Sequence, residues 1–553
     1  HNESKSEGNI GRQVMLSSEE LLHYNASVND VHNIDVLLGV NTNKEQAFSM
    51  YGYGLRGVSD DVYYYNPQKV PPVVNHGTPE FPDYAATRYY SSDFTEKRMV
   101  SYFGRLGYNY KQRYLLEFTF RRDGSSTFGE GNRWANFPSV AVGWSFSEEP
   151  FIKRLTGGWL NWGKIRGSYG KSGQTFTSAY LAHGLMNIMD KSFFGKTGIT
   201  TDKPVSPYLT WEKTRQYDLG LDMDMFNYRL NVKLDYYYKY TSSLIYDIPI
   251  PGSLYAFGAQ VENAMEISNE GLELELQADI LRESAVSWRM KFNMARNWNR
   301  FEKSYSGKDV VDGDGTLLVV GRPLNGLYVW AHRGYYNSDA EVPRLYKIDG
   351  QEIYFNGVAT NGISGAVGDY RLLDLDGDGN PDSYYAGSPL PLAHGGWVNE
   401  LMWKNFDLNV LVNFTIGRKM INNRMGLGFS RQSEDGHLTK LFDYRKLRPW
   451  DGVNKKPNAP AWGNSLSMNT DSAIEKVHHL ALKQITLGYN LPDRISKKAG
   501  LSGVRFFLTA ENLFYLSNYS GGNPEVVNIY TGRDNGDTYP LPRKYTLGLT
   551  LNF

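Results

Sequence analysis

The residues best placed to do chemistry are four aspartates in one acidic turn. Asp374, Asp376 and Asp378 alternate within the sequence DLDGDG, and Asp382 follows shortly after. This pattern matches the first half of an EF-hand loop, in which alternate carboxylates converge on one Ca²⁺ ion. The match fails at the twelfth position, which is Tyr385 instead of Glu, and no helical pattern flanks the turn. A structural calcium site and an ion-free acidic turn are both open, and catalysis is poorly supported.

Other chemical signatures give no support to an enzyme or a nucleic-acid-binding protein. The 10 histidines are scattered, and no His-Glu-x-x-His, Walker-type or Gly-x-Ser-x-Gly motif is present. The chain has no cysteine, which excludes disulfides, thiolate metal sites and cysteine nucleophiles. Basic and acidic residues number 59 each, so the basic excess typical of nucleic-acid binding is missing. We expect no catalytic residues and no nucleic-acid partner.

The last nine residues predict a strand with one apolar face. Large apolar side chains alternate with small or polar ones, at Tyr545, Leu547, Leu549, Leu551 and Phe553. In water such an edge promotes aggregation. In a membrane barrel the apolar face contacts lipid, the polar face contacts the lumen, and the edge pairs with a neighbour. The terminal strand therefore predicts an all-β protein, a transmembrane antiparallel β-barrel of the bacterial outer membrane in contact with the lipid bilayer.

The composition is typical of many such strands. Aromatic residues make up 14% of the 553 residues and there are 56 glycines, which suits aromatic girdles and tight turns. The mean hydropathy is −0.49, and no run reaches the 18 apolar residues of a membrane helix. This excludes spanning helices but not barrel strands, which place only every second residue in lipid.

Alternating runs recur along the chain, and many form pairs separated by a few turn residues, as in hairpins. Including fainter runs at 34–40, 139–146, 161–169 and 317–330, we count roughly 14 to 16 strands. In the run 271–277, glutamates face away from leucines and are expected to line a wet lumen. The clearest runs are 98–110 with 114–121, 216–224 with 230–238, 271–277 with 288–298, and 397–403, 406–414, 482–491 and 504–513.

Longer segments between these pairs are rich in Gly, Pro, Asn, Asp and Tyr. We expect them to be loops on the outer face, where binding usually occurs. They are located at about 59–92, 173–209, 300–316, 331–396 and 417–477.

Several segments jointly resemble the SusC/RagA-like TonB-dependent transporters of Bacteroidetes outer membranes. The resemblance runs along nearly the whole chain. Its segments are YLLEFTFRRDGSSTFG at 114–129, FPSVAVGW at 137–144, KIRGSYG at 164–170, LTWEKT at 209–214, ISNEGLEL at 267–274, DLDGDG at 374–379, ITLGYNLP at 485–492, ENL at 511–513, NPE at 523–525 and the final Phe553.

The resemblance implies a barrel of 22 strands, filled by an N-terminal plug domain and energised through a TonB box. This sequence shows neither plug nor box, and its strand count is roughly six to eight short of 22. It opens with HNESK and shows no secretory signal. We therefore expect residues 1–553 to be the C-terminal part of the barrel, forming one domain with long extracellular loops.

The resemblance also implies a function and partners. Family members import oligosaccharides or peptides with a SusD-like surface lipoprotein as a lid and the TonB complex as energy source. Aromatic loops favour a glycan as the substrate. The resemblance is also compatible with a dimer of two transporter–lid pairs. Tyr545, Leu547, Leu549, Leu551 and Phe553 would form the signal read by the barrel-assembly machinery. The alternatives are a peptide importer, a plugless diffusion porin of about 16 strands, and a secreted β-rich sugar-binding or sugar-cleaving protein.

Overall fold

The computed structural model describes most of the chain, and the statements below refer to that part. The described residues are 5–55, 73–75, 84–86, 88–175, 178–184, 186–193, 196–201, 204–255, 257–282, 284–311, 317–342, 344–346, 352–354, 367–375, 382–423, 448–453, 456–461, 470–536 and 538–553. They fall into two compact units. Unit 1 comprises His1–Gly143, Ser168–Gln216 and Thr241–Met265, and unit 2 comprises Trp144–Gly167, Tyr217–Tyr240 and Glu266–Phe553.

Long antiparallel strands dominate both units and belong to one 16-stranded sheet. A two-residue strand, β27 (Arg533–Asp534), joins it by parallel pairing with β24. The other strands, in sheet order, are β1 (Lys5–Val28), β2 (His32–Leu55), β5 (Arg88–Tyr110), β6 (Tyr114–Ser125), β7 (Trp134–Trp144), β8 (Leu160–Gln174), β11 (Glu212–Met225), β12 (Leu230–Pro249), β13 (Ala259–Leu281), β14 (Val286–Lys303), β23 (Ala393–Trp403), β24 (Phe406–Asn422), β25 (Ile474–Asn490), β26 (Gly503–Ser517) and β28 (Lys544–Asn552).

Shorter elements occupy the connections. Six two-stranded ribbons pair β3 (Val73–Asn75) with β4 (Tyr84–Ala86), β9 (Met186–Phe193) with β10 (Lys196–Thr201), β15 (Val310–Val311) with β16 (Leu317–Leu318), β17 (Leu327–Trp330) with β22 (Ser383–Gly387), β18 (His332–Tyr335) with β21 (Tyr370–Leu372), and β19 (Arg344–Tyr346) with β20 (Glu352–Tyr354). The helices are α1 (Pro150–Thr156), α2 (Gly252–Tyr255) and α4 (Asp493–Ser496), with 3₁₀ turns η2 (Glu130–Asn132), η3 (Phe146–Glu148), η4 (Asp339–Glu341), η6 (Asp471–Ala473), η7 (Lys497–Ala499) and η8 (Pro524–Val526). None of the helices in the described ranges is long and apolar enough to cross a membrane.

In unit 1, period-two alternation separates an apolar face from a polar one. Leu38, Leu106 and Phe118 have half-exposed side chains on one side of the strands, which we call the apolar face of unit 1. On the opposite face Asp35 pairs with Arg105, with Nη2 and Oδ1 2.7 Å apart. The strands are in register through β1, β2, β5 and β6, and the hairpins turn at residues 29–31 and 111–113. This is the pattern of a membrane strand with lipid on one side and water on the other.

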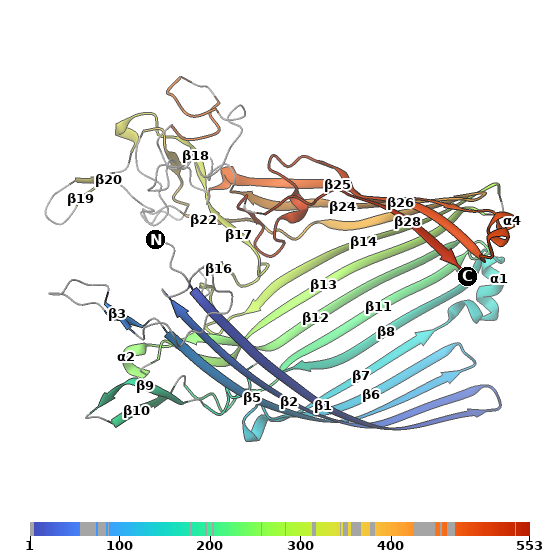
Figure 1. Ribbon diagram of the computed structural model, residues 1–553, viewed down its shortest axis with the longest axis horizontal. Helices are drawn as coiled ribbons and strands as arrows, with labels where there is room; N and C mark the ends of the chain where they lie inside the picture. Colours follow the sequence, from blue (N-terminus) through green and yellow to red (C-terminus); the bar gives the residue numbers. More distant parts are fainter. Residues whose placement is uncertain are drawn as a thin grey trace. The chain divides into compact units, whose positions relative to one another are not determined.

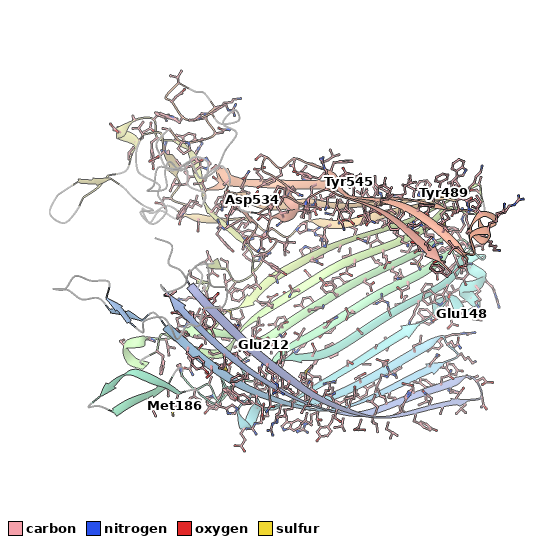
Figure 2. All side chains as sticks on the ribbon, in the orientation of Figure 1. Glu148, Met186, Glu212, Tyr489, Asp534 and Tyr545 are labelled. Atoms are coloured by element: carbon pink, nitrogen blue, oxygen red, sulfur yellow. The ribbon has the colours of Figure 1, made fainter. Side chains whose placement is uncertain are left out.

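In unit 2, short and long connections alternate between the two ends of the strands. β13 and β14 are joined by residues 282–285 and β23 and β24 by residues 404–405, whereas residues 304–392 and 423–473 form the long connections. Figure 1 shows α4 and the C-terminus at one end of this unit and β17, β18 and β22 at the other. In Figure 2, Tyr489 lies near α4 and Asp534 toward the opposite end. Short turns face the periplasm in outer-membrane barrels, so the long connections mark the outer end.

Buried apolar clusters lie next to the long connections. Leu327, Val329, Ala386 and Ile421 form one in unit 2, and Met420, Val477, Tyr519 and Val527 form another. In unit 1, Phe128, Ala135, Phe137 and Trp211 pack together. Membrane strands have lipid on one side and a polar interior on the other, so a dry core forms only where loops fold over the strand ends.

The sequence located most strands correctly and missed or misplaced two features. The predicted hairpin 98–110 with 114–121 is confirmed as β5–β6, and the predicted strands 397–403, 406–414 and 482–491 are confirmed as β23, β24 and β25. The predicted strand at 317–330 is wrong: it is broken into β16 and β17, which pair outside the main sheet, because Gly321 adopts a left-handed φ of 83°. β1 was not predicted, because its sequence lacks strict alternation. The single-domain assignment stays a prediction.

Candidate functional site

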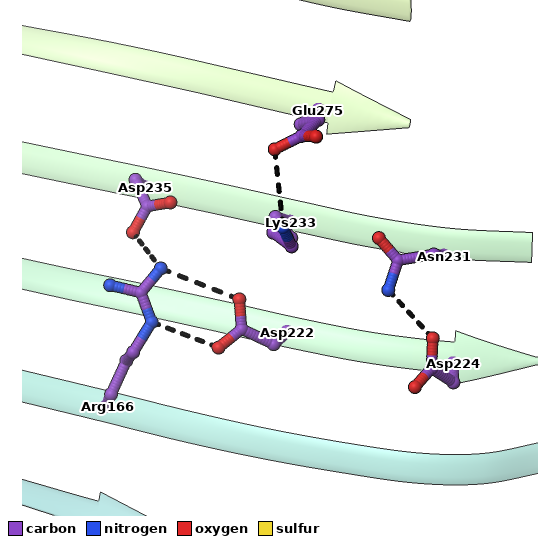
Figure 3. Close-up of polar contacts among 7 residues, drawn as sticks. All are labelled: Arg166, Asp222, Asp224, Asn231, Lys233, Asp235 and Glu275. Carbon is purple, nitrogen blue, oxygen red and sulfur yellow. Dashed lines mark hydrogen bonds and ion pairs between the residues drawn. The ribbon is translucent and has the colours of Figure 1, made fainter. Parts of the chain in front are cut away.

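The polar face of unit 2 is crossed by ion pairs that link successive strands. Arg166 of β8 reaches two carboxylates (Figure 3). Its Nε lies 3.0 Å from Oδ2 of Asp222 on β11, and its Nη2 lies 2.5 Å from Oδ1 of Asp235 on β12. The planar guanidinium therefore spans three strands with one side chain, which a lysine point charge would not do.

A glycine makes room for this guanidinium. A Cβ at Gly220 of β11 would lie 2.5 Å from Cζ of Arg166 and 2.7 Å from Oδ1 of Asp235. No real Cβ tolerates such a contact, so any side chain at this position would displace the ion pair. The same arrangement recurs at Gly488, where a Cβ would lie 2.5 Å from Nη2 of Arg505. At both positions glycine leaves the space that the arginine side chain occupies.

Similar contacts continue along the polar face. Lys233 Nζ lies 3.4 Å from Oε2 of Glu275, and Asn231 donates to Oδ1 of Asp224 at 2.7 Å (Figure 3). Further pairs join neighbouring strands up to β26. We call the whole set the charge ladder: Arg166, Asp222, Asp224, Asn231, Lys233, Asp235, Glu275, Asp279, Arg289, Lys291, Glu400, Asp407 and Arg505.

The charge ladder is a hydrated surface and contributes little to folding. Its pairs are partly open to solvent; the side chains of Lys233 and Glu275, for example, are 44% and 59% exposed. Pairs of this kind contribute about 0.2–1 kcal/mol each. Glu275 and Gln277 face Asn293 and Lys291 in register. That the glutamates of 271–277 line a wet lumen stays a prediction.

A second polar cluster lies among the long connections of unit 2. His332 Nδ1 contacts Oδ1 of Asp471 in η6, and the Tyr384 hydroxyl donates to Oδ2 of Asp471 at 3.2 Å. Tyr370 packs edge-on against the His332 ring with centroids 4.8 Å apart, and its hydroxyl accepts a hydrogen bond from Ser472 at 2.9 Å. Burial first, and then the Asp471 charge, raise the pKa of Tyr384 above its ordinary value. The cluster fastens η6 to β18, β21 and β22.

Two further tyrosines form an aromatic pair beside it. The rings of Tyr328 and Tyr385 lie 5.7 Å apart, and Arg322 lies over the Tyr385 ring at 4.8 Å. The Tyr328 hydroxyl is out of solvent and has no hydrogen-bond partner among the described residues. Burial, reinforced by Tyr385, raises the pKa of Tyr328 to about 12.

A buried arginine anchors the last long connection. Arg418 of β24 is 5% exposed and donates to the carbonyl oxygens of Pro524, Val527 and Asn528 at 3.2, 2.9 and 3.0 Å. These carbonyl oxygens solvate the buried charge. The outer segment around η8 is thereby held over β24.

The predicted calcium ligands lie only partly within the described residues. Asp376 and Asp378 lie outside them. Asp382 Oδ2 accepts the amide hydrogen of Leu375 at 2.5 Å, as in an ordinary polar turn. Within the described ranges, no three His, Cys, Asp or Glu residues gather as a metal site. The calcium site stays a prediction.

The predicted assembly signal forms an exposed strand. β28 pairs with β26 in register, with Leu547 opposite Leu508 and Leu549 opposite Phe506. Tyr545, Leu547, Leu549, Leu551 and Phe553 are all exposed, from 42% to 92%. Their reading by the assembly machinery stays a prediction. The sequence did not predict the ladder residues Arg166 and Asp222. Its one signal was that Arg166 lies within the family-like segment KIRGSYG at 164–170.

Comparisons with known proteins decide the family. The model of the family "TonB dependent receptor-like, beta-barrel" matches residues 8–385. The chain belongs to this TonB-dependent receptor family. The receptor P26 of Formosa agariphila is 30% identical over 97% of the chain and 53% of its own length. SusC of Bacteroides thetaiotaomicron is 29% identical over 85% of the chain and 45% of its own length.

A solved structure has the same fold. The RagAB peptide transporter chain superposes with a TM-score of 0.80 at 22% identity, over 99% of this chain and 56% of that one. This TonB-dependent receptor chain is therefore SusC/RagA-like and an outer-membrane protein, as the sequence predicted. Its family is one of receptors and transporters, not a class of enzymes. The chain spans about half the length of the curated relatives it matches.

Proposed function

We propose that this chain forms the C-terminal part of the wall of an active outer-membrane importer. TonB energises the transport, and a SusD-like surface lipoprotein closes the outer end. The single observation that carries this proposal is the charge ladder, a hydrated and internally paired surface on one face of membrane strands. Such a face can border the path of a polar solute without trapping anions, because each of its five cations already has a carboxylate partner.

We propose an oligosaccharide as the cargo. Tyr530 and Tyr539, in the outer segment between β26 and β28, are 78% and 85% exposed. Flat aromatic rings can stack on the apolar faces of sugar rings while their hydroxyls stay hydrated. The Arg418 anchor restrains the segment that contains Tyr530, which reduces the entropy lost on binding. A peptide cargo and a plugless porin are the alternatives.

The first test is extraction of the native protein from outer membranes in mild detergent, followed by mass spectrometry of the complex. A co-purifying lipoprotein and a chain containing a plug support the lidded importer. A single chain without plug or lipoprotein contradicts it and favours the porin.

The second test measures binding of oligosaccharide and oligopeptide panels to the same complex. The variants Tyr530→Ala and Tyr539→Ala are expected to weaken oligosaccharide binding about tenfold, in line with a lost stacking contact of 1–1.5 kcal/mol. Tyr228→Ala is the matched control, because Tyr228 is also exposed but lies in the short turn after β11. Binding of peptides alone would overturn the glycan assignment and leave the importer intact.

We also propose that the turn containing Asp374, Asp376, Asp378 and Asp382 binds structural Ca²⁺. Four carboxylates within nine residues give the hard oxygen donors that calcium prefers. Metal analysis of the purified native protein, with Asp376→Asn and Asp378→Asn in combination as the variant, tests it. Absence of bound calcium at every concentration tried would contradict this site.

A further inference from the structure

The apolar face of unit 1 contains an open hollow of about 760 Å³. Three rows of side chains line it, each row running across neighbouring strands in register. The row nearest the short turns has Val36, Leu106 and Phe118, and the next has Leu22, Leu38, Gly104 and Phe120. The outermost row has Glu20, Val40, Tyr102 and Arg122. The hollow is therefore apolar toward the membrane centre and polar at its outer end.

Gly104 forms the floor of this hollow. It stands in the middle row between Leu38 and Phe120, where every neighbour carries a large side chain. A Cβ at Gly104 would lie 3.1 Å from Cδ2 of Leu38, so even a methyl group would crowd the hollow. Leu38, Tyr102, Leu106, Phe118 and Phe120 are between 41% and 51% exposed, which leaves their apolar surface open to a ligand.

The outer end of the hollow carries a cation that lacks an acidic partner. Arg122 lies over the Trp134 ring at 5.2 Å, and no carboxylate lies within ion-pair distance of it among the residues that the structure describes. Tyr102 stacks on the same ring, with centroids 6.1 Å apart. The guanidinium is therefore held in place by aromatic groups while its donors stay free.

Two more cations lie farther out on the same face. Lys44 and Arg98 follow Val40 and Tyr102 at even spacing and share one carboxylate, Glu96, at 3.5 and 2.6 Å. Together, Lys44, Arg98 and Glu96 carry one net positive charge. Glu20 stands at the other edge of the hollow, three strand spacings or about 14 Å from Arg122, where salt screens its charge.

The position along the strands fits the membrane boundary. From Tyr108, beside the short turn, to Arg98 the strand β5 runs through ten residue steps. A tilted strand crosses the hydrocarbon region in about 9–11 residues. Arg98 and Lys44 thus lie at the level of the outer headgroups, and the apolar rows lie at the level of the acyl chains. Arg122 is in register with Tyr102, four residue steps deeper than Arg98. Its guanidinium lies over the Trp134 ring, which covers Gly124 two positions farther out, so the long side chain extends toward the headgroups.

We propose that this hollow is a specific binding site for a phosphate-bearing, acylated lipid of the outer leaflet. The acyl chains would lie over Gly104 between Leu38 and Phe120, and the phosphate would accept hydrogen bonds from the free guanidinium of Arg122. Lys44 and Arg98 add long-range attraction for the anionic headgroup of the lipid.

The experiment uses the native protein, purified in detergent and reconstituted into nanodiscs of neutral lipid. Native mass spectrometry counts bound phosphatidic acid, and diacylglycerol with the same chains serves as the probe without phosphate. We expect phosphatidic acid to bind at least about fivefold more tightly than diacylglycerol, because one cation near the surface contributes about 1 kcal/mol. Equal binding of the two would overturn the proposal.

Two variants with matched controls test the two halves of the hollow. Arg122→Gln should lower phosphatidic acid binding about fivefold. Lys111→Gln should leave it unchanged; Lys111 is a cation over an aromatic ring too, that of Tyr110, but it lies in the short turn. Gly104→Ala should weaken binding of both lipids, and Gly107→Ala, on the opposite face of β5, should leave both unchanged. Unaltered binding in Arg122→Gln, or a second copy of the protein on this face instead of lipid, would contradict the site.

Discussion

Tyr328, which is half-buried, and Tyr370, which is buried, differ in whether their hydroxyl groups form hydrogen bonds with described residues. Tyr328→Phe removes a hydroxyl that has no partner in the described part of the chain, so we expect stability to be unchanged or raised by about 1 kcal/mol. Tyr370→Phe removes the acceptor of the Ser472 hydrogen bond and should destabilise the outer region by about 1 kcal/mol. Thermal or denaturant unfolding of the two variants in detergent measures the difference. Equal loss in both would show that the Tyr328 hydroxyl is bonded.

The raised pKa of Tyr328 predicts a loss of stability at alkaline pH. Burial raises the pKa of Tyr328 to about 12 in the folded protein, above the ordinary tyrosine value of 10.0. The folded state therefore holds the proton of Tyr328 more tightly than the unfolded state. The stability that this adds is fully present below pH 10 and is lost as the pH rises toward 12. Unfolding followed from pH 9 to 12 should show a smaller decline in Tyr328→Phe than in the unaltered protein. An identical decline in both would refute the assignment.

At the scale of elements, Arg418 holds η8 over β24 through three carbonyl oxygens. Arg418→Met keeps the side chain's bulk but leaves these acceptors without their donor, at a cost of about 1–3 kcal/mol. We expect faster amide hydrogen exchange across residues 518–536 with little change in the membrane strands. Lys498→Met, an exposed cation in η7, serves as the control. Unchanged exchange in the Arg418 variant would show that other contacts hold this segment.

The terminal strand gives a second prediction for an element. Phe553 is 92% exposed and follows the alternating apolar face of β28. Its deletion should lower the amount of protein inserted in the outer membrane several-fold, because the assembly machinery would lose the end of its signal. Removal of the Tyr228 side chain, equally aromatic but in a turn, should have no such effect. Immunodetection in isolated outer membranes measures both. Normal levels after deletion would count against the role.

The sequence predicted elements better than it predicted the contacts between them. Strict alternation located β5, β6, β23 and β28, since membrane strands must present lipid on one side and water on the other. The bond between Arg166 and Asp222 could not be predicted, because it depends on the register of strands 56 residues apart. The need for glycine at position 220 could not be predicted either, because it depends on the Arg166 guanidinium that lies beside it.

At the scale of the whole molecule, balanced charge predicts weak electrostatic steering. The chain carries 59 basic and 59 acidic residues, and every cation of the charge ladder has a carboxylate partner. A neutral oligosaccharide should therefore bind with less than about a twofold change between low and physiological salt. The double variant Asp222→Asn with Asp235→Asn leaves Arg166 without its two carboxylates and should attract anionic solutes at low salt. Fluorescence titration of a neutral and an anionic oligosaccharide measures both effects. Equal binding of the anionic oligosaccharide to the double variant and to the unaltered protein at low salt would contradict the idea that Asp222 and Asp235 neutralise Arg166 on the solute path.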